Sequence, residues 1–180
     1  MKFDLTLSMA AMVTSIVTLV LFLLLHYVIE PCKEKKRKKS EKFKELYAPL
    51  YMMINARLTT VILHEEQKGA ENLHFTNGGS EGFIDDDYMI EFVLKNSSYA
   101  SVELLWELDN YNRYATDGTL TSLEYENLTK TVITEYQQIR KDLGLEYNEK
   151  ELETGLPTAI RHIRAIHSIK MSNQNNKVAE

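Results

Sequence analysis

The chain has 180 residues and a formal net charge of −5, from 21 Lys and Arg residues against 26 Asp and Glu residues. The charge is unevenly distributed, because residues 45–180 hold 22 acidic and only 12 basic side chains, which is a net charge of −10. Such an acidic stretch argues against nucleic acid as a partner, and the presence of a single cysteine excludes an intrachain disulfide.

The first element is an apolar segment over residues 5–29, which contains no Asp, Glu, Lys or Arg. As a helix it would extend roughly 37 Å, and the hydrocarbon core of a bilayer is about 30 Å thick. A cleaved signal peptide would have a shorter apolar region that ends in small residues, whereas this one ends Ile29-Glu30-Pro31-Cys32. Residues 1–30 are therefore predicted to form a single transmembrane anchor.

A basic run follows the apolar segment, within a juxtamembrane linker over residues 31–44. Its candidate lipid-contacting residues are Lys33, Lys35, Lys36, Arg37, Lys38 and Lys39. Positive residues resist translocation, so we expect a single-pass protein of the inner cell membrane, with its N-terminus outside and its C-terminal domain in the cytoplasm. The same run could also hold anionic lipid headgroups, at about 1 kcal/mol per residue near the surface.

Small residues recur within the predicted span. Ala11 and Ser15 lie four residues apart, a spacing that lets two helices approach closely in lipid and so predicts a homodimer through this face. The alternative is that Ser and Thr hydroxyls bond back to their own helix. His26 lies near the inner end of the span, where we expect it at the headgroup level.

The remaining chain predicts an all-α fold, with a cytoplasmic bundle of about four helices over residues 45–171 and a polar tail over residues 172–180. The expected helices cover residues 40–64, 85–114, 121–143 and 157–169, with one short turn of helix near residues 148–151. In the second of these, apolar residues follow a heptad-like line, and Trp106 lies off it. That line is Ile90, Leu94, Leu104, Leu108 and Tyr111.

The longest expected connection is the loop from Gln67 to Gly82, which contains Asn77-Gly78-Gly79-Ser80 and lacks apolar periodicity. A loop of about 16 residues is longer than a simple connection requires. This length predicts either a functional or a disordered segment.

One short stretch near the C-terminus has the residue types of a phosphoryl-transfer site. Arg161-His162-Ile163-Arg164-Ala165-Ile166-His167 resembles the Arg-x4–6-His signature of the HEPN family, whose members are helical bundles and include dimeric, metal-independent ribonucleases. The resemblance implies that Arg161 stabilises a phosphate charge and that His167 acts as acid or base. The alternative is a basic final turn that complements the C-terminus of a helix.

Two stretches of the sequence contain residue types that can bind metal ions. Asp117 to Glu124 is similar to the second half of an EF-hand loop, but that register places Arg113 where the first carboxylate ligand belongs, so a plain turn is expected. A second group could offer imidazole and carboxylate ligands at the end of a helix, without a metalloprotease spacing. It comprises His64, Glu65, Glu66 and His74. We expect neither a metal ion nor a cofactor.

These observations predict a membrane-anchored module whose helical domain binds an unidentified protein partner near the inner leaflet, as a scaffold, sensor or inhibitor. The sequence favours this interpretation over an enzyme. The alternatives are a HEPN-like ribonuclease that uses Arg161 and His167, and a phage-type protein that permeabilises the membrane.

Overall fold

The computed structural model describes residues 2–68, 75 and 84–162, and this part of the chain is helical with no β-strand. Side chains are described from residue 9 onward, except those of residue 10 and residues 59–68. The chain divides into two compact units, Met1–Ser40 and Glu41–Glu180. Each unit is described on its own.

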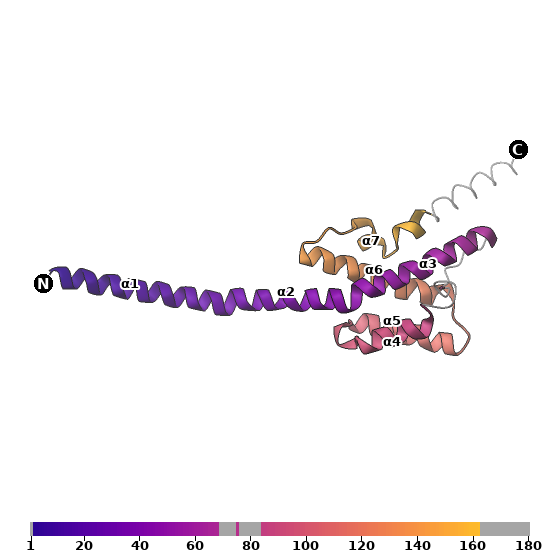
Figure 1. Cartoon of the computed structure of the whole chain (residues 1–180), viewed down its shortest axis with the longest axis horizontal. Coiled ribbons are helices and arrows are strands. Elements are labelled where there is room, and N and C mark those ends of the chain that lie inside the picture. Colours follow the sequence, from indigo (N-terminus) through magenta and orange to yellow (C-terminus); the bar gives the residue numbers. More distant parts are fainter. Residues whose placement is uncertain (1, 69–74, 76–83, 163–180) are drawn as a thin grey trace, which may run out of the picture. The chain divides into compact units, whose positions relative to one another are not determined.

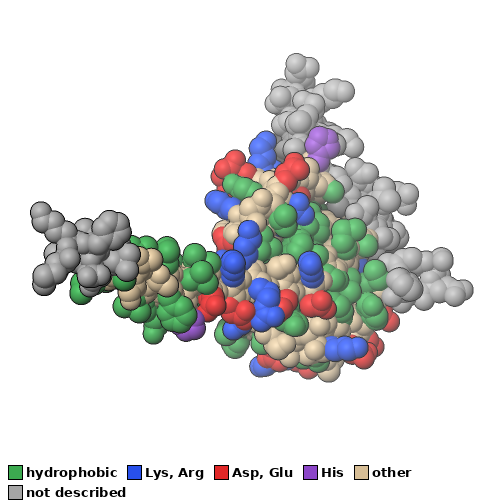
Figure 2. Space-filling view, turned by 60° about the vertical axis from the view of Figure 1, so that its left-hand side comes forward, with side chains coloured by type: hydrophobic (Ala, Val, Ile, Leu, Met, Phe, Trp, Pro, Cys, Tyr) green, Lys and Arg blue, Asp and Glu red, His purple; other side chains and the backbone are tan. Residues whose placement is uncertain are grey.

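The first unit is built from α1 (Lys2–Leu24), a π-helical turn η1 (Leu25–Ile29) and most of α2 (Glu30–Lys42). From residue 11 to residue 30 every side chain is exposed, and hydrophobic side chains cover the visible part of α1 (Figure 2). Among the described residues, one helix is long and apolar enough to cross a membrane, and it lies near the N-terminus. The predicted apolar helix is therefore present.

The second unit begins with a π-helical turn η2 (Phe43–Tyr47) and continues as α3 (Ala48–Lys68). Leu46, Leu50, Ile54 and Leu58 recur every four residues, and all four are buried. This repeat forms one apolar stripe on a helix, and burying that stripe is the main favourable term in its packing. The helix expected over residues 40–64 is present, but it does not begin at Ser40, because α2, η2 and α3 follow one another without a break, and it ends later, at Lys68.

The helix predicted over residues 85–114 is wrong as a single element, because the chain forms α4 (Asp86–Lys95), a short 3₁₀ turn η3 (Ser97–Tyr99) and α5 (Val102–Thr116). The side chain of Ser101 accepts a hydrogen bond from the amide of Leu104 and begins α5 as its N-cap. The amide of Ser101 itself donates to the Tyr47 hydroxyl, at 3.3 Å. The heptad-like line is thus interrupted, and Leu94 is exposed.

The next helices match the prediction closely. Helix α6 (Ser122–Leu143) begins with a capping box of Thr121 and Glu124, and it ends at Gly144, which has a left-handed φ of 74°. Helix α7 (Glu149–Thr154) is capped by Asn148, as its sequence predicted. Residues 158–162 begin a further helix, and the rest of the predicted final helix lies outside the described residues.

These helices share one hydrophobic core. Helix α6 packs against α3, α5 and α7, and α3 also contacts α4 (Figure 1). The fully buried core side chains come from η2 and helices α3 to α6. They include Leu46, Tyr47, Leu50, Ile54, Met89, Val93, Leu104, Tyr111, Leu128 and Val132.

Candidate functional site

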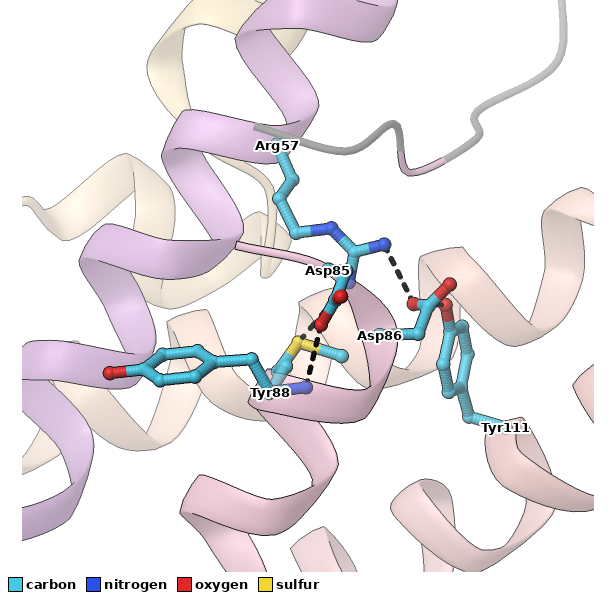
Figure 3. A network of polar contacts seen from close by, with 6 residues as sticks. Arg57, Asp85, Asp86, Tyr88 and Tyr111 are labelled. Atoms are coloured by element: carbon cyan, nitrogen blue, oxygen red, sulfur yellow. Dashed lines mark hydrogen bonds and ion pairs between the residues drawn. The ribbon is translucent and has the colours of Figure 1, made fainter. Parts of the chain in front are cut away.

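The most deeply buried charge in the described residues is Arg57 on α3, which has no exposed surface. Its Nη2 lies 2.6 Å from Oδ1 of Asp86, at the start of α4 (Figure 3). The Tyr111 hydroxyl on α5 donates to the same carboxylate oxygen. The guanidinium also lies 4.7 Å from the ring centre of Phe75 and 3.7 Å from the Met89 sulfur. This network joins three helices.

The chemistry of this network is structural. Burial and the hydrogen bond to Asp86 raise the pKa of Tyr111 far above its ordinary value, so the phenol stays protonated and donates. The Asp86 carboxylate neutralises a cation that would otherwise be very costly to bury. Asp85 beside it caps α4, because its Oδ1 accepts from the amide of Tyr88 at 2.8 Å (Figure 3). The Asp85-Asp86-Asp87 run thus forms the N-terminal end of α4.

A second buried carboxylate, Glu151 on α7, holds the C-terminal part of the second unit together. Its Oε2 accepts from Gln137 at 2.7 Å and from the Tyr51 hydroxyl at 3.1 Å. Its Oε1 accepts from the amide and the hydroxyl of Thr158, at 2.9 and 2.8 Å. Both oxygens are therefore satisfied by neutral donors, and α7 is fixed to α3, α6 and the helix that follows it.

An open pocket of about 570 Å³ lies beside Glu151. On one side Tyr51 and Tyr136 stack with ring centres 3.9 Å apart, and Arg140 lies over the Tyr136 ring at 5.5 Å. The remaining lining residues mix acidic, basic and amide side chains, including Glu146, Asn148, Glu149 and Lys150. Arg140 is already engaged, since it donates to the Tyr136 hydroxyl at 2.9 Å and to the backbone oxygen of Glu146 at 2.5 Å. This lining does not select one chemical class of ligand.

The predicted pair Arg161 and His167 is described only in part. Arg161 is partly buried and donates to the Thr158 hydroxyl at 3.1 Å, while its Nε is buried and has no hydrogen-bond partner among the residues that the structure describes. His167 lies outside the described residues, so the structure does not bring the pair together.

Of the two patterns with metal-binding residue types, the structure describes the side chains of the first but not those of the second. Asp117 and Gly118 end α5 in a turn, with a left-handed φ of 67° at Gly118, and Arg113 forms an exposed ion pair with Asp109 at 2.7 Å. The side chains of His64, Glu65, Glu66 and His74 lie outside the described ones. Among the residues that the structure describes, no three His, Cys, Asp or Glu side chains gather as a metal site.

In the first unit, the predicted lipid-facing and packing residues are exposed. Ala11 and Ser15 lie on the surface of α1, and the Thr18 hydroxyl bonds back to the carbonyl of Thr14 at 2.8 Å. His26 pairs with Glu30 at 2.7 Å, at the point where the apolar stretch ends. The basic side chains are all exposed. They are Lys33, Lys35, Lys36, Arg37, Lys38 and Lys39.

The loop expected from Gln67 to Gly82 is almost entirely outside the described residues. Gln67 and Lys68 belong to the end of α3 instead. Phe75 is the described exception within the loop, and its ring is buried against Tyr111 and Tyr125, with ring centres 5.9 and 5.0 Å away. At least this residue of the predicted loop is therefore part of the core.

The most unusual exposed feature of the second unit lies on α5. Val102 is 87% exposed and Trp106, one turn later, is 59% exposed. Glu103 and Glu107 alternate with them along the helix. We call these four residues the α5 face. The sequence offered one signal for it, which is that Trp106 lies off the apolar line that forms the buried side of the helix.

No protein-family model, curated protein or solved structure matches the chain. The described part of the chain is a helical protein in which one helix is long and apolar enough to cross a membrane.

Proposed function

We propose that this chain is a single-pass membrane protein whose helical domain lies in the cytoplasm and binds a protein partner close to the inner leaflet. The observation that carries the proposal is the N-terminal helix, which is uncharged over residues 5–29 and exposed along its described length. Exposing about 20 apolar residues to water is energetically unfavourable, whereas the hydrocarbon core of a bilayer accommodates them.

The charged groups that follow this helix support the proposed depth of the helix in the bilayer and its proposed orientation across the membrane. His26 pairs with Glu30 where the apolar residues end, which suits the polar headgroup region. Lys33 to Lys39 then supply the basic flank that remains on the cytoplasmic side of a membrane. An anchor of this kind raises the concentration of the domain at the membrane and so favours encounters with partners located there.

The domain supports binding better than catalysis. Its two buried carboxylate networks join helices, and Arg140 in its pocket is already engaged in hydrogen bonds. An exposed tryptophan is, by contrast, a residue type that is enriched where proteins contact each other. Trp106 on the α5 face is the only tryptophan in the chain.

The proposal is tested first by topology. Cys32 is the only cysteine and is exposed just after the apolar helix, so a membrane-impermeant maleimide reports its side of the membrane directly. We expect the protein to resist extraction by alkaline carbonate and to be labelled only after the cells are permeabilised. Labelling of intact cells, or release by carbonate, contradicts the proposal.

A second experiment distinguishes a binding module from a permeabilising protein and from a ribonuclease. Residues 1–30 are replaced by an unrelated transmembrane helix, and His167→Ala is made in the full chain. A binding module keeps its phenotype in both variants. A permeabilising protein loses its activity with the replaced helix, and a ribonuclease loses its activity with His167→Ala while the fold is kept.

A further inference from the structure

Glu107 is near enough to Glu103, and to Glu124 on α6, for its charge to repel theirs. Partial burial raises the pKa of the Glu107 carboxyl, and the nearby carboxylates of Glu103 and Glu124 raise it further. Glu124 is occupied by the capping box, in which it accepts from the amide of Thr121 at 2.9 Å. Glu103 and Glu107 have no ion-pair partner among the described residues. Their field is therefore negative and uncompensated.

Apolar surface lies next to these carboxylates. Val102 and Trp106 point away from the buried side of α5, which is formed by Leu104, Leu108 and Tyr111. On α6, the exposed Leu123 directly precedes Glu124. Exposed apolar side chains beside charged ones are the arrangement of a protein–protein contact, in which an aromatic anchor is ringed by polar groups.

We infer that the α5 face binds a basic amphipathic segment of another protein, in which apolar side chains cover Val102 and Trp106 and Lys or Arg side chains pair with Glu103 and Glu107. This inference rests on the proposed function, because it names the partner chemistry of the same domain. Charge complementarity selects this occupant, since the cations of the partner relieve the repulsion between the two glutamates.

Two other occupants fit the face less well. The basic run of a second copy, residues 33–39, has the required charge but no apolar side chain to cover Trp106. An anionic lipid surface would cover Trp106 but would be repelled by Glu103 and Glu107. A segment that is both basic and apolar satisfies both requirements.

The test is photo-crosslinking from the full-length protein in cells of its natural host, with benzoylphenylalanine in place of Val102. The matched control carries the same group in place of Leu145, which is exposed outside α5. We expect an adduct with a discrete protein from position 102 and none from position 145. Mass spectrometry of the adduct should map the contact to a segment that places Lys or Arg beside apolar residues.

The chemistry is then tested by substitution in the crosslinking protein. Glu103→Gln with Glu107→Gln should lower the adduct yield by about three- to tenfold, and Trp106→Ala by about thirtyfold. Glu149→Gln with Glu153→Gln removes two exposed carboxylates at the same spacing on α7 and should leave the yield unchanged. Circular dichroism verifies that each variant keeps its helix content.

The inference is overturned by an adduct with lipid or with a second copy, by a mapped segment without basic residues, or by equal effects of the α5 and α7 glutamate pairs. A protein adduct from position 145 but not from position 102 would reject the α5 face while leaving the proposed function standing. The absence of protein adducts from both positions would count against both.

Discussion

The guanidinium of Arg57 lies 2.6 Å from the carboxylate of Asp86, and the two side chains differ sharply in exposure. Arg57 has no exposed surface, whereas the Asp86 side chain is 41% exposed. The anion therefore reaches the surface of the domain, while the cation that it pairs with is buried. This contact joins α3 to α4 through two residues that lie 29 positions apart in sequence.

Asp86→Asn should destabilise the domain by about 3 kcal/mol, because it removes the carboxylate charge that lies 2.6 Å from the buried guanidinium of Arg57 and accepts the hydrogen bond of the Tyr111 hydroxyl. The measurement is the free energy of unfolding of the full-length protein in non-ionic detergent, followed by helical circular dichroism during denaturant titration.

Asp109→Asn is the matched control for this substitution. Asp109 forms an exposed ion pair with Arg113, one turn along the same helix, and such pairs contribute less than about 1 kcal/mol. If the two substitutions destabilise the protein equally, burial of Arg57 does not decide the stability of this network.

Two glycines that end helices provide a second prediction. Gly144 and Gly155 both have a left-handed φ, of 74° and 65°, which an L side chain adopts at a cost of about 1 kcal/mol. A methyl group at Gly144 meets nothing within 4 Å, whereas at Gly155 it would lie 3.0 Å from the side chain of Lys130 and 3.1 Å from its Cα.

Gly144→Ala should therefore destabilise the protein by about 1 kcal/mol, and Gly155→Ala should cost clearly more, since α7 must also move away from α6. Thermal unfolding of the full-length variants gives the comparison. A lower Tm for Gly144→Ala than for Gly155→Ala would contradict the close approach of α7 to α6.

These glycines also show which parts of the fold the sequence could predict. Gly144 follows an apolar repeat of period three to four, and Asn148 precedes a short acidic turn, so both helix boundaries were predictable from local chemistry. The break at Ser101 was missed: its N-cap hydrogen bond with the amide of Leu104 is local, but its own amide bonds to Tyr47, which lies 54 residues earlier. A contact this distant leaves no periodic signal near residue 101.

The buried tyrosines predict how stability depends on pH. Burial, with the nearby carboxylate of Glu151, raises the pKa of Tyr51 to about 12. In the unfolded chain a phenol titrates near 10. Between these values the native protein holds a proton that the unfolded chain has released, so its stability is complete below pH ~10 and is lost as the pH rises toward 12.

Tyr51→Phe should make this loss of stability above pH ~10 less steep, because one of the linked protons is removed. The dependence of the free energy of unfolding on pH should become only partly less steep, because burial also raises the pKa of Tyr47 and Tyr111. The measurement is the free energy of unfolding at several pH values between 9 and about 11.5. Tyr114→Phe, at an exposed position, is the control, and an identical change of slope in both variants would rule out burial as the cause.

The candidate sites were less predictable than the helices. The sequence drew attention to Arg161 and His167, but a motif in one segment does not show which side chains meet. Arg57 and Glu151 gave no signal of their own, because a buried charge is recognised only once its partners are placed around it. Trp106 was visible as a residue off the apolar line, although only the fold shows that it is exposed.

The basic run after the apolar helix gives the last prediction. Replacing the six basic residues from Lys33 to Lys39 with Gln removes most of the positive flank, since only Lys42 and Lys44 remain after the apolar segment and Lys2 before it. Orientation follows the excess of Lys and Arg near the ends of a membrane helix, so a fraction of the molecules should insert with the opposite orientation. Labelling of Cys32 by an impermeant maleimide in intact cells should then increase from the background level.

Lys141→Gln with Lys150→Gln removes basic residues far from the helix in sequence and should leave the labelling at background. Full protection of Cys32 in both variants would show that the basic run does not set the orientation, and its exposed side chains would then be explained by contact with anionic headgroups alone.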